Sequence, residues 1–131
     1  MSIRCITVDP VWAWAIMEGI KRVENRSWRT AFRGRLGIHA GLGGKRDNAA
    51  RALLHGIGVT VPESIRCEAI LGSVILDQIE AYARSLPGMS SPLESDPLVY
   101  GPWCWLLRDP RPLALPLFYR GQQGLWHGPD F

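Results

Sequence analysis

The pattern of hydrophobic and polar residues predicts short strands and helices joined by tight turns. Segments rich in β-branched or aromatic residues, or with alternating polar and apolar side chains, are typical of strands. We expect strands at residues 3–8, 22–26, 34–40, 67–76, 103–107 and 113–119. Pro112 and Pro116 confine the last of these to a sheet edge or a bulge, because proline donates no hydrogen bond to a neighbouring strand.

Two helices are expected among the strands. The first covers residues 11–18, where Asp9 suits the N-cap, Pro10 the first turn and Gly19 the position after the last turn. The second covers residues 47–55. Helices that interrupt the strands without strict alternation favour an α+β mixed barrel over a doubly wound parallel sheet.

The composition is typical of a globular domain. A chain of 131 residues, 47% hydrophobic and 21% charged, is long enough for one core, so we expect a single domain over residues 1–131. Residues 83–99 hold four serines and three prolines and are expected to form a lid or a mobile loop. The longest apolar stretch, residues 11–17, is too short to cross a membrane. Three cysteines without a C-x-x-C pair, and no apolar leader, predict reduced thiols in a cytoplasmic protein.

Basic residues gather in the first part of the chain. Residues 1–51 hold ten basic and four acidic residues, a net charge of +6, whereas the remainder carries −3. This excess predicts a candidate anion-facing surface. A solvated basic face without a ligand accounts for the same numbers.

The chain departs from the common phosphate and metal motifs. Gly41-Leu-Gly-Gly-Lys45 is similar to a phosphate-binding loop, but His39 and Arg46 stand where that motif requires glycine and Ser or Thr. Glycine amides and two cations before a helix still suit a phosphate. The three histidines, His39, His55 and His127, lie far apart in sequence, so we expect no metal site and no cofactor.

Six tryptophans are candidates for either core or ligand contacts. Cations are interleaved with Trp12, Trp14 and Trp28, so we expect at least one of these to stack on a base. Trp103 and Trp105 share one face of their expected strand. The alternative is that most of the six belong to the core.

Residues 19–26 read Gly-Ile-Lys-Arg-Val-Glu-Asn-Arg, with the spacing G-x-K-x-x-E-x-R. This resembles the signature of the ASCH family (activating signal cointegrator homology), in which a helix ends in the glycine. Further matches are Trp12-Ala-Trp14, Trp28, Arg33-Gly34, Ile38-His39-Ala40, Gly101-Pro-Trp103-Cys-Trp105 and the segment from Arg120 to Trp126. The resemblance covers nearly the whole chain.

The resemblance implies the fold of the PUA-like superfamily, a mixed β-barrel with short helices covering its openings. It also implies a role with RNA, because PUA-like domains bind RNA or modified bases in a cleft beside the barrel. Some relatives hydrolyse RNA or acylated cytidine, and in the latter the motif's lysine works with a threonine three residues on. Glu24 stands at that position here, so the covalent-nucleophile role does not carry over.

Two functions fit these residues. The first is an RNA- or nucleotide-binding domain, in which cations hold phosphates and tryptophans stack on bases. Its candidate ligand contacts are Trp12, Trp14, Lys21, Arg26, Trp28, Arg33 and His39. The second is a hydrolase acting on RNA or on an acylated cytidine nucleoside, with Glu24 as general base and Lys21 as electrostatic stabiliser.

The hydrolase interpretation lacks a named nucleophile, which favours binding. Its third catalytic group stays open among Glu68, Asp77 and Glu80. A purely structural ion network of Lys21 with its two motif partners is the remaining interpretation.

Overall fold

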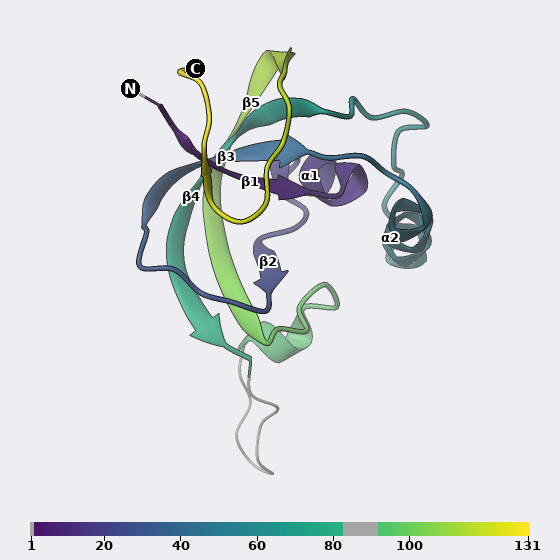
Figure 1. Cartoon of the computed structure of the whole chain (residues 1–131). Helices are drawn as coiled ribbons and strands as arrows, with labels where there is room; N and C mark the ends of the chain where they lie inside the picture. The colour runs from purple at the N-terminus through teal and green to yellow at the C-terminus, as the bar shows by residue number, and fades with distance from the viewer. Residues whose placement is uncertain (1, 83–91) are drawn as a thin grey trace.

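The computed structural model of the chain describes residues 2–82 and 92–131 (Figure 1). In chain order the described elements are β1 (Arg4–Val8), α1 (Pro10–Met17), β2 (Val23–Arg26), β3 (Gly34–Ala40), α2 (Lys45–Gly56), β4 (Ala69–Ala81), the 3₁₀ turn η1 (Pro92–Ser95), β5 (Trp103–Phe118) and β6 (Trp126–His127). The lid or mobile loop expected at residues 83–99 falls largely outside the described residues.

The strands form one mixed sheet in the order β2-β5-β4-β3-β1-β6. β1 pairs in parallel with β3, and the other neighbouring strands are antiparallel. Figure 1 shows that the long strands β4 and β5 curve strongly. The α+β prediction is confirmed, and a doubly wound parallel sheet is excluded.

The predicted barrel does not close. β2 and β6 stand at the two ends of the sheet order and do not pair with each other. β2 has four residues and β6 has two, so both strands are too short to close the barrel by pairing with each other. The predicted mixed α+β fold is present, but its sheet is open and is not closed into a barrel.

The core lies between the curved sheet and α1. Ile6, Ile38 and Trp105, from β1, β3 and β5, are fully buried in one cluster with the apolar face of α1. α2 packs against α1, where Val11 and Leu54 share a second buried cluster. Burial of an aliphatic or aromatic side chain of this size contributes roughly 1.5–3 kcal/mol. These contacts fix the residues at both ends of α1 relative to the sheet.

The two strands predicted in the last third of the chain are one continuous strand, β5. Pro110, Pro112 and Pro116 fit within it because β2 pairs with β5 only over the four residues from Trp103 to Leu106. Beyond Leu106, among the described residues, the outer edge of β5 has no strand partner that needs a proline N–H.

Both helices begin close to the predicted residues. α1 starts at Pro10, and Gly19 follows its end with a φ of +74°, the left-handed conformation expected after a last turn. Asp9 occupies the N-cap position without a side-chain capping hydrogen bond. α2 starts at Lys45, two residues before the predicted start, and its preceding residue Gly44 has a φ of +141°.

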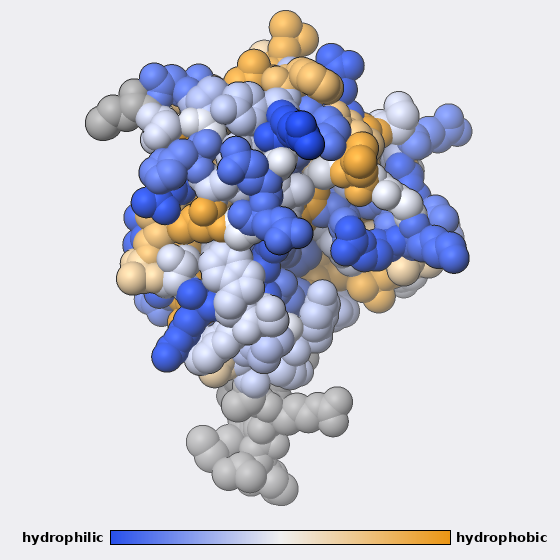
Figure 2. Space-filling view, viewed as in Figure 1, coloured by the Kyte–Doolittle hydropathy of each residue, from blue (hydrophilic) through white to orange (hydrophobic). Residues whose placement is uncertain are grey.

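The outer surface is largely hydrophilic in the view of Figure 2. An apolar patch lies over the far end of β5, where Leu115 and Phe118 are exposed. Across residues 2–82 and 92–131, none of the helices is long and apolar enough to cross a bilayer. Cys5, Cys67 and Cys104 are all free thiols.

Candidate functional site

A polar cavity opens at the point where β1 ends, α1 begins and β2 lies nearby. Its volume is about 360 Å³, and we name it the Glu24 cavity. Its lining residues are Thr7, Val8, Asp9, Trp12, Glu24, Asn25, Arg26, Gly41, Leu42, Arg46 and Tyr100. They come from β1, α1, β2, the loop after β3, the first turn of α2 and the residue before Gly101. Segments far apart in the sequence therefore build one site.

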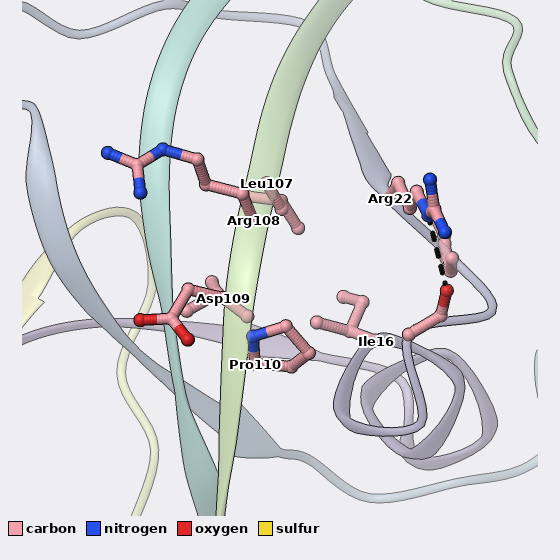
Figure 3. A pocket seen from close by; sticks show the side chains of 9 residues that line it. Ile16, Arg22, Leu107, Arg108, Asp109 and Pro110 are labelled. Atoms are coloured by element: carbon pink, nitrogen blue, oxygen red, sulfur yellow. Dashed lines mark hydrogen bonds between the residues drawn. The ribbon is translucent and has the colours of Figure 1, made fainter.

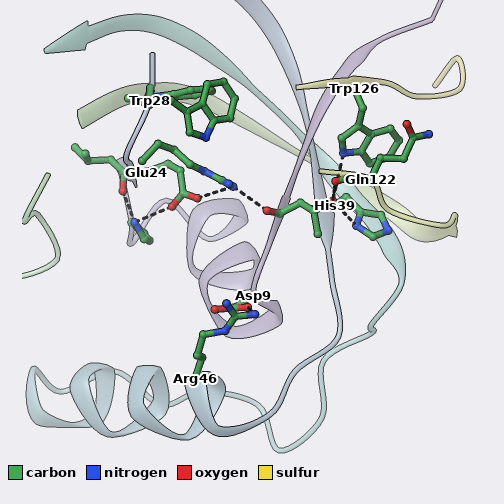
Figure 4. A network of polar contacts seen from close by, with 12 residues as sticks. Asp9, Glu24, Trp28, His39, Arg46, Gln122 and Trp126 are labelled. Atoms are coloured by element: carbon green, nitrogen blue, oxygen red, sulfur yellow. Dashed lines mark hydrogen bonds and ion pairs between the residues drawn. The ribbon is translucent and has the colours of Figure 1, made fainter. Parts of the chain in front are cut away.

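Glu24 lies between two cations in this cavity (Figure 4). Its Oε1 is 3.4 Å from Nζ of Lys21, and its Oε2 is 3.0 Å from Nη2 of Arg26. The side chain of Glu24 is 9% exposed, so this carboxylate is largely withdrawn from water. Each carboxylate oxygen of Glu24 therefore has its own cationic partner.

Lys21 is a buried cation behind Glu24. Its side chain is 3% exposed, and Nζ donates to the carbonyl oxygen of Val23 as well as to Glu24. Nζ also lies 5.5 Å from the centroid of the Trp12 ring, within range of a cation–π contact. Burial lowers the pKa of Lys21, and the charge of Glu24 opposes that effect. Lys21 therefore acts on the Glu24 cavity through Glu24 and Trp12, which line it, and is absent from the lining itself.

Arg26 joins Glu24 to the end of β1. Its Nη2 donates to the carbonyl oxygen of Thr7 at 2.7 Å and also faces Glu24. Its Nε is buried and has no hydrogen-bond partner among the described residues. Within residues 2–82 and 92–131, Nη2 is the one guanidinium nitrogen of Arg26 with a protein partner, so this lining residue keeps donor capacity for a ligand.

A second ion pair brings the first turn of α2 to the cavity. Nη2 of Arg46 lies 3.1 Å from Oδ1 of Asp9 (Figure 4). Oδ1 of Asp47 accepts a hydrogen bond from the backbone N–H of Val11 at 3.1 Å, which ties the start of α2 to α1. Burial raises the pKa of Asp9, and the charge of Arg46 opposes that shift. Arg46 is itself 81% exposed, so its guanidinium remains accessible to an anion.

Tyr100 is a lining residue that sequence reasoning missed. It is 71% exposed, and Oδ1 of Asn25 accepts hydrogen bonds from the backbone N–H groups of Tyr100 and Gly101. Nδ2 of Asn25 donates to the carbonyl oxygen of Leu98. Asn25 thus fixes the backbone that presents an aromatic ring at the rim. Partial desolvation and the charge of Glu24 both raise the pKa of Tyr100.

Residues 6–92, more than half of the chain, match the ASCH domain. The chain belongs to the ASCH family. It is similar to Activating signal cointegrator 1 of Homo sapiens, at 30% identity over 133 residues, and to the protein of that name in Mus musculus, at 29%. Each alignment covers 93% of this chain and 22% of the relative, so the chain spans about a fifth of the length of these relatives. The family inferred from residues 19–26 is confirmed.

Four candidate residues of this ASCH domain come together around the Glu24 cavity. Trp12, Glu24 and Arg26 line it, and Lys21 lies directly behind Glu24. The spacing of the ASCH motif accounts for this grouping: Glu24 and Arg26 share one face of β2, and Lys21 precedes that strand by two residues. Whether these residues bind a ligand stays a prediction.

The other two candidate tryptophans lie outside the cavity lining. Trp14 is half-buried against the second core cluster, between α1 and α2. Trp28 packs edge-on against Trp105, with ring centroids 4.9 Å apart, and its carbonyl oxygen accepts a hydrogen bond from Nε1 of Trp105. Both have packing partners that account for their position.

His39 and Arg33 also lie away from the lining of the cavity. His39 is fully buried: Nδ1 is 3.2 Å from Oγ1 of Thr7, and Nε2 is 2.6 Å from the carbonyl oxygen of Tyr119. It therefore reaches the site through Thr7, whose carbonyl oxygen accepts a hydrogen bond from Arg26. Arg33 is exposed, and its Nη1 donates to the carbonyl oxygens of Thr30 and Phe32.

The three candidate carboxylates for a catalytic partner all point elsewhere. Asp77 pairs with Arg108, Glu68 lies 3.7 Å from Nε2 of His39, and Glu80 is exposed on β4. None of the three lines the Glu24 cavity. Within residues 2–82 and 92–131, no three His, Cys, Asp or Glu side chains gather in a way that could hold a metal ion.

Proposed function

We propose that this ASCH domain binds a nucleotide unit of single-stranded RNA in the Glu24 cavity. The observation that carries the proposal is the meeting of Arg26, Trp12 and Tyr100 in one hollow of about 360 Å³. A guanidinium with a free nitrogen suits a phosphate or carbonyl oxygen, and aromatic rings suit the face of a base. A volume near the lower end of the range for small-ligand sites suits one nucleotide better than a duplex.

Positive charge around the mouth of the Glu24 cavity suits the phosphate backbone of the RNA on either side of the bound nucleotide. Lys45 and Arg46 are exposed in the first turn of α2, beside the loop that lines the cavity. Cations in such positions neutralise phosphates, and their contribution falls as salt rises. The cavity itself is balanced, because Glu24 and Asp9 neutralise the two arginines that line it. This distribution of charge suits a ligand whose neutral base edge lies inside the cavity and whose phosphates lie outside it.

The arrangement of Glu24 favours binding over hydrolysis. A general base needs a free oxygen within reach of the proton it accepts, and both oxygens of Glu24 already face cations. To separate the two functions, we would incubate labelled RNA and an acylated cytidine nucleoside with wild type and Glu24→Gln. Product formed by wild type and lost in the variant would replace the binding proposal with the hydrolase.

Replacing Tyr100 tests the binding site without disturbing the core, because the side chain is exposed. Base–aromatic stacking contributes roughly 1–3 kcal/mol per base, so Tyr100→Ala should weaken binding of a fluorescently labelled single-stranded RNA about 5- to 150-fold. Phe118→Ala is the matched control, since Phe118 is an exposed aromatic outside the cavity. Equal affinity of wild type and Tyr100→Ala, or no binding by wild type, would overturn the proposal.

A further inference from the structure

A second cavity lies on the other side of Lys21, between the end of α1 and β5 (Figure 3). Its volume is about 370 Å³, close to that of the Glu24 cavity. Its lining residues are Ile16, Gly19, Lys21, Arg22, Val74, Leu107, Arg108, Asp109 and Pro110. We name it the bulge cavity. It shares no lining residue with the Glu24 cavity.

A β-bulge in β5 forms one wall of this cavity. In the ladder with β4, Ser73 pairs with Arg111 and Ile75 with Arg108, so two residues of β5 lie opposite Val74 alone. These two residues are Asp109 and Pro110, and Asp109 has a φ of +53°, in the left-handed region. Bulges bend a strand and redirect its side chains, and they are enriched beside functional sites. Here the bend adjoins Val74, a lining residue of the cavity.

Ion pairs hold the bulge in this conformation. Arg35 Nη2 lies 2.7 Å from Oδ2 of Asp109, and Arg111 Nη2 lies 3.0 Å from the same oxygen. Nη1 of Arg35 also donates to the carbonyl oxygen of Asp109 at 2.9 Å. Figure 3 shows the carboxylate of Asp109 directed away from the neighbouring Pro110 and Ile16. The negative charge of Asp109 is thus neutralised outside the cavity.

The remaining lining combines an apolar body with an available cation. Ile16, Val74, Leu107 and Pro110 supply aliphatic surface. Arg22 stands on the α1 side of the hollow, and Nε of Arg22 makes a long hydrogen bond of 3.5 Å to the carbonyl oxygen of Gly19 (Figure 3). Within the described residues, its two terminal nitrogens have no hydrogen-bond or ion-pair partner. A planar guanidinium with two free nitrogens is suited to a carboxylate.

We propose that the bulge cavity binds a small organic acid, one with a compact apolar body and a single carboxylate. The aliphatic wall takes the body, and Arg22 pairs with the carboxylate at the mouth. Asp109 is paired with two arginines, Lys21 with Glu24 and Arg108 with Asp77. Among the described lining residues, Arg22 is therefore the charged side chain left without an ion-pair partner. This inference is independent of RNA binding, because the two cavities have separate linings.

Two aromatic probes of one shape test the proposal on the full chain. Naphthalene-2-carboxylate carries the charge, and naphthalene-2-carboxamide has the same body without it. Backbone amide shifts followed by NMR should change saturably with the carboxylate at Gly19, Arg22, Val74 and Asp109. The carboxamide should bind about tenfold more weakly or not at all, since a charge-assisted hydrogen bond is lost.

Arg22→Ala isolates the anion contact, because Arg22 is exposed and its loss leaves the core intact. We expect this variant to bind the carboxylate about tenfold more weakly, to the level of the carboxamide. Arg66→Ala is the matched control, an exposed arginine that lines neither cavity, and should bind like wild type. Shifts centred on the exposed end of β5, no saturation by about 10 mM probe, or equal affinity of Arg22→Ala and wild type would overturn the proposal.

Discussion

Neutralising Glu24 without changing its shape should destabilise the fold, because two cations face its carboxylate. In Glu24→Gln, Nζ of Lys21 at 3.4 Å and Nη2 of Arg26 at 3.0 Å lose their counter-charge. Removing one partner of a buried ion pair costs roughly 3–5 kcal/mol. Each cation keeps a backbone acceptor, Val23 for Lys21 and Thr7 for Arg26, which offsets part of the loss. We expect the free energy of unfolding to fall by about 2–3 kcal/mol.

Urea denaturation near pH 7 measures this loss, alongside Lys21→Met and the double variant. Lys21→Met keeps an apolar stem in the same space, so in the double variant no buried ammonium is left without its counter-charge. The two changes should therefore be coupled by about 1–2 kcal/mol, with the double variant more stable than the sum predicts. Glu63→Gln, at an exposed glutamate outside the cavity, is the control and should change stability by less than about 0.5 kcal/mol. A loss for Glu24→Gln as small as the control's, or strict additivity, would refute the reasoning.

Four further outcomes are expected. Arg46→Ala should flatten the log–log salt dependence of single-stranded RNA binding by about 0.7, the contribution of one phosphate contact, and an unchanged slope would remove Arg46 from the interface. At about pH 8 a thiol reagent should modify the half-buried Cys67 of the folded protein and spare Cys5, because burial raises the pKa of Cys5 to about 11. Since that pKa exceeds the ordinary value of 9.0, the folded state keeps a proton that the unfolded state loses. Stability measured by denaturation should therefore fall as the pH rises above 9, and Cys5→Ala should reduce this fall. Gly72→Ala should destabilise by about 1–3 kcal/mol in thermal melts, because the added methyl group would collide with the backbone of β5 and with Met17; an unchanged melting temperature would contradict this packing.

Local pattern accounts for most of the elements but not for how they assemble. The strand predicted at residues 34–40 is β3, with the same bounds, because the alternate residues Leu36, Ile38 and Ala40 face the core on one side. β5 was expected as two strands because its prolines interrupt the pattern. They fit within one strand because β2 pairs with only four residues along its outer edge. That pairing depends on the tertiary structure and not on local sequence. The lack of pairing between β2 and β6 likewise depends on strand lengths, which the hydrophobic pattern does not define.

The sequence predicted the part of the candidate site that lies within one continuous segment. Lys21, Glu24 and Arg26 lie within six residues, so motif spacing was enough to bring them together. Arg46 and Tyr100 enter from α2 and from the residue before Gly101, which only the fold brings to β2. His39 was expected to touch a ligand but lies fully buried behind Thr7, because β3 stands inside the sheet.

The outer edge of β5 has a consequence for how the protein behaves at high concentration. Past Leu106 this edge lacks a neighbouring strand among the described residues, and exposed Leu115 and Phe118 lie along it. An unpaired, apolar strand edge is a template on which further chains can add and start aggregation. Pro110, Pro112 and Pro116 interrupt it with three residues that have no N–H to donate. The prolines therefore reduce the number of N–H groups that this open edge offers to another chain.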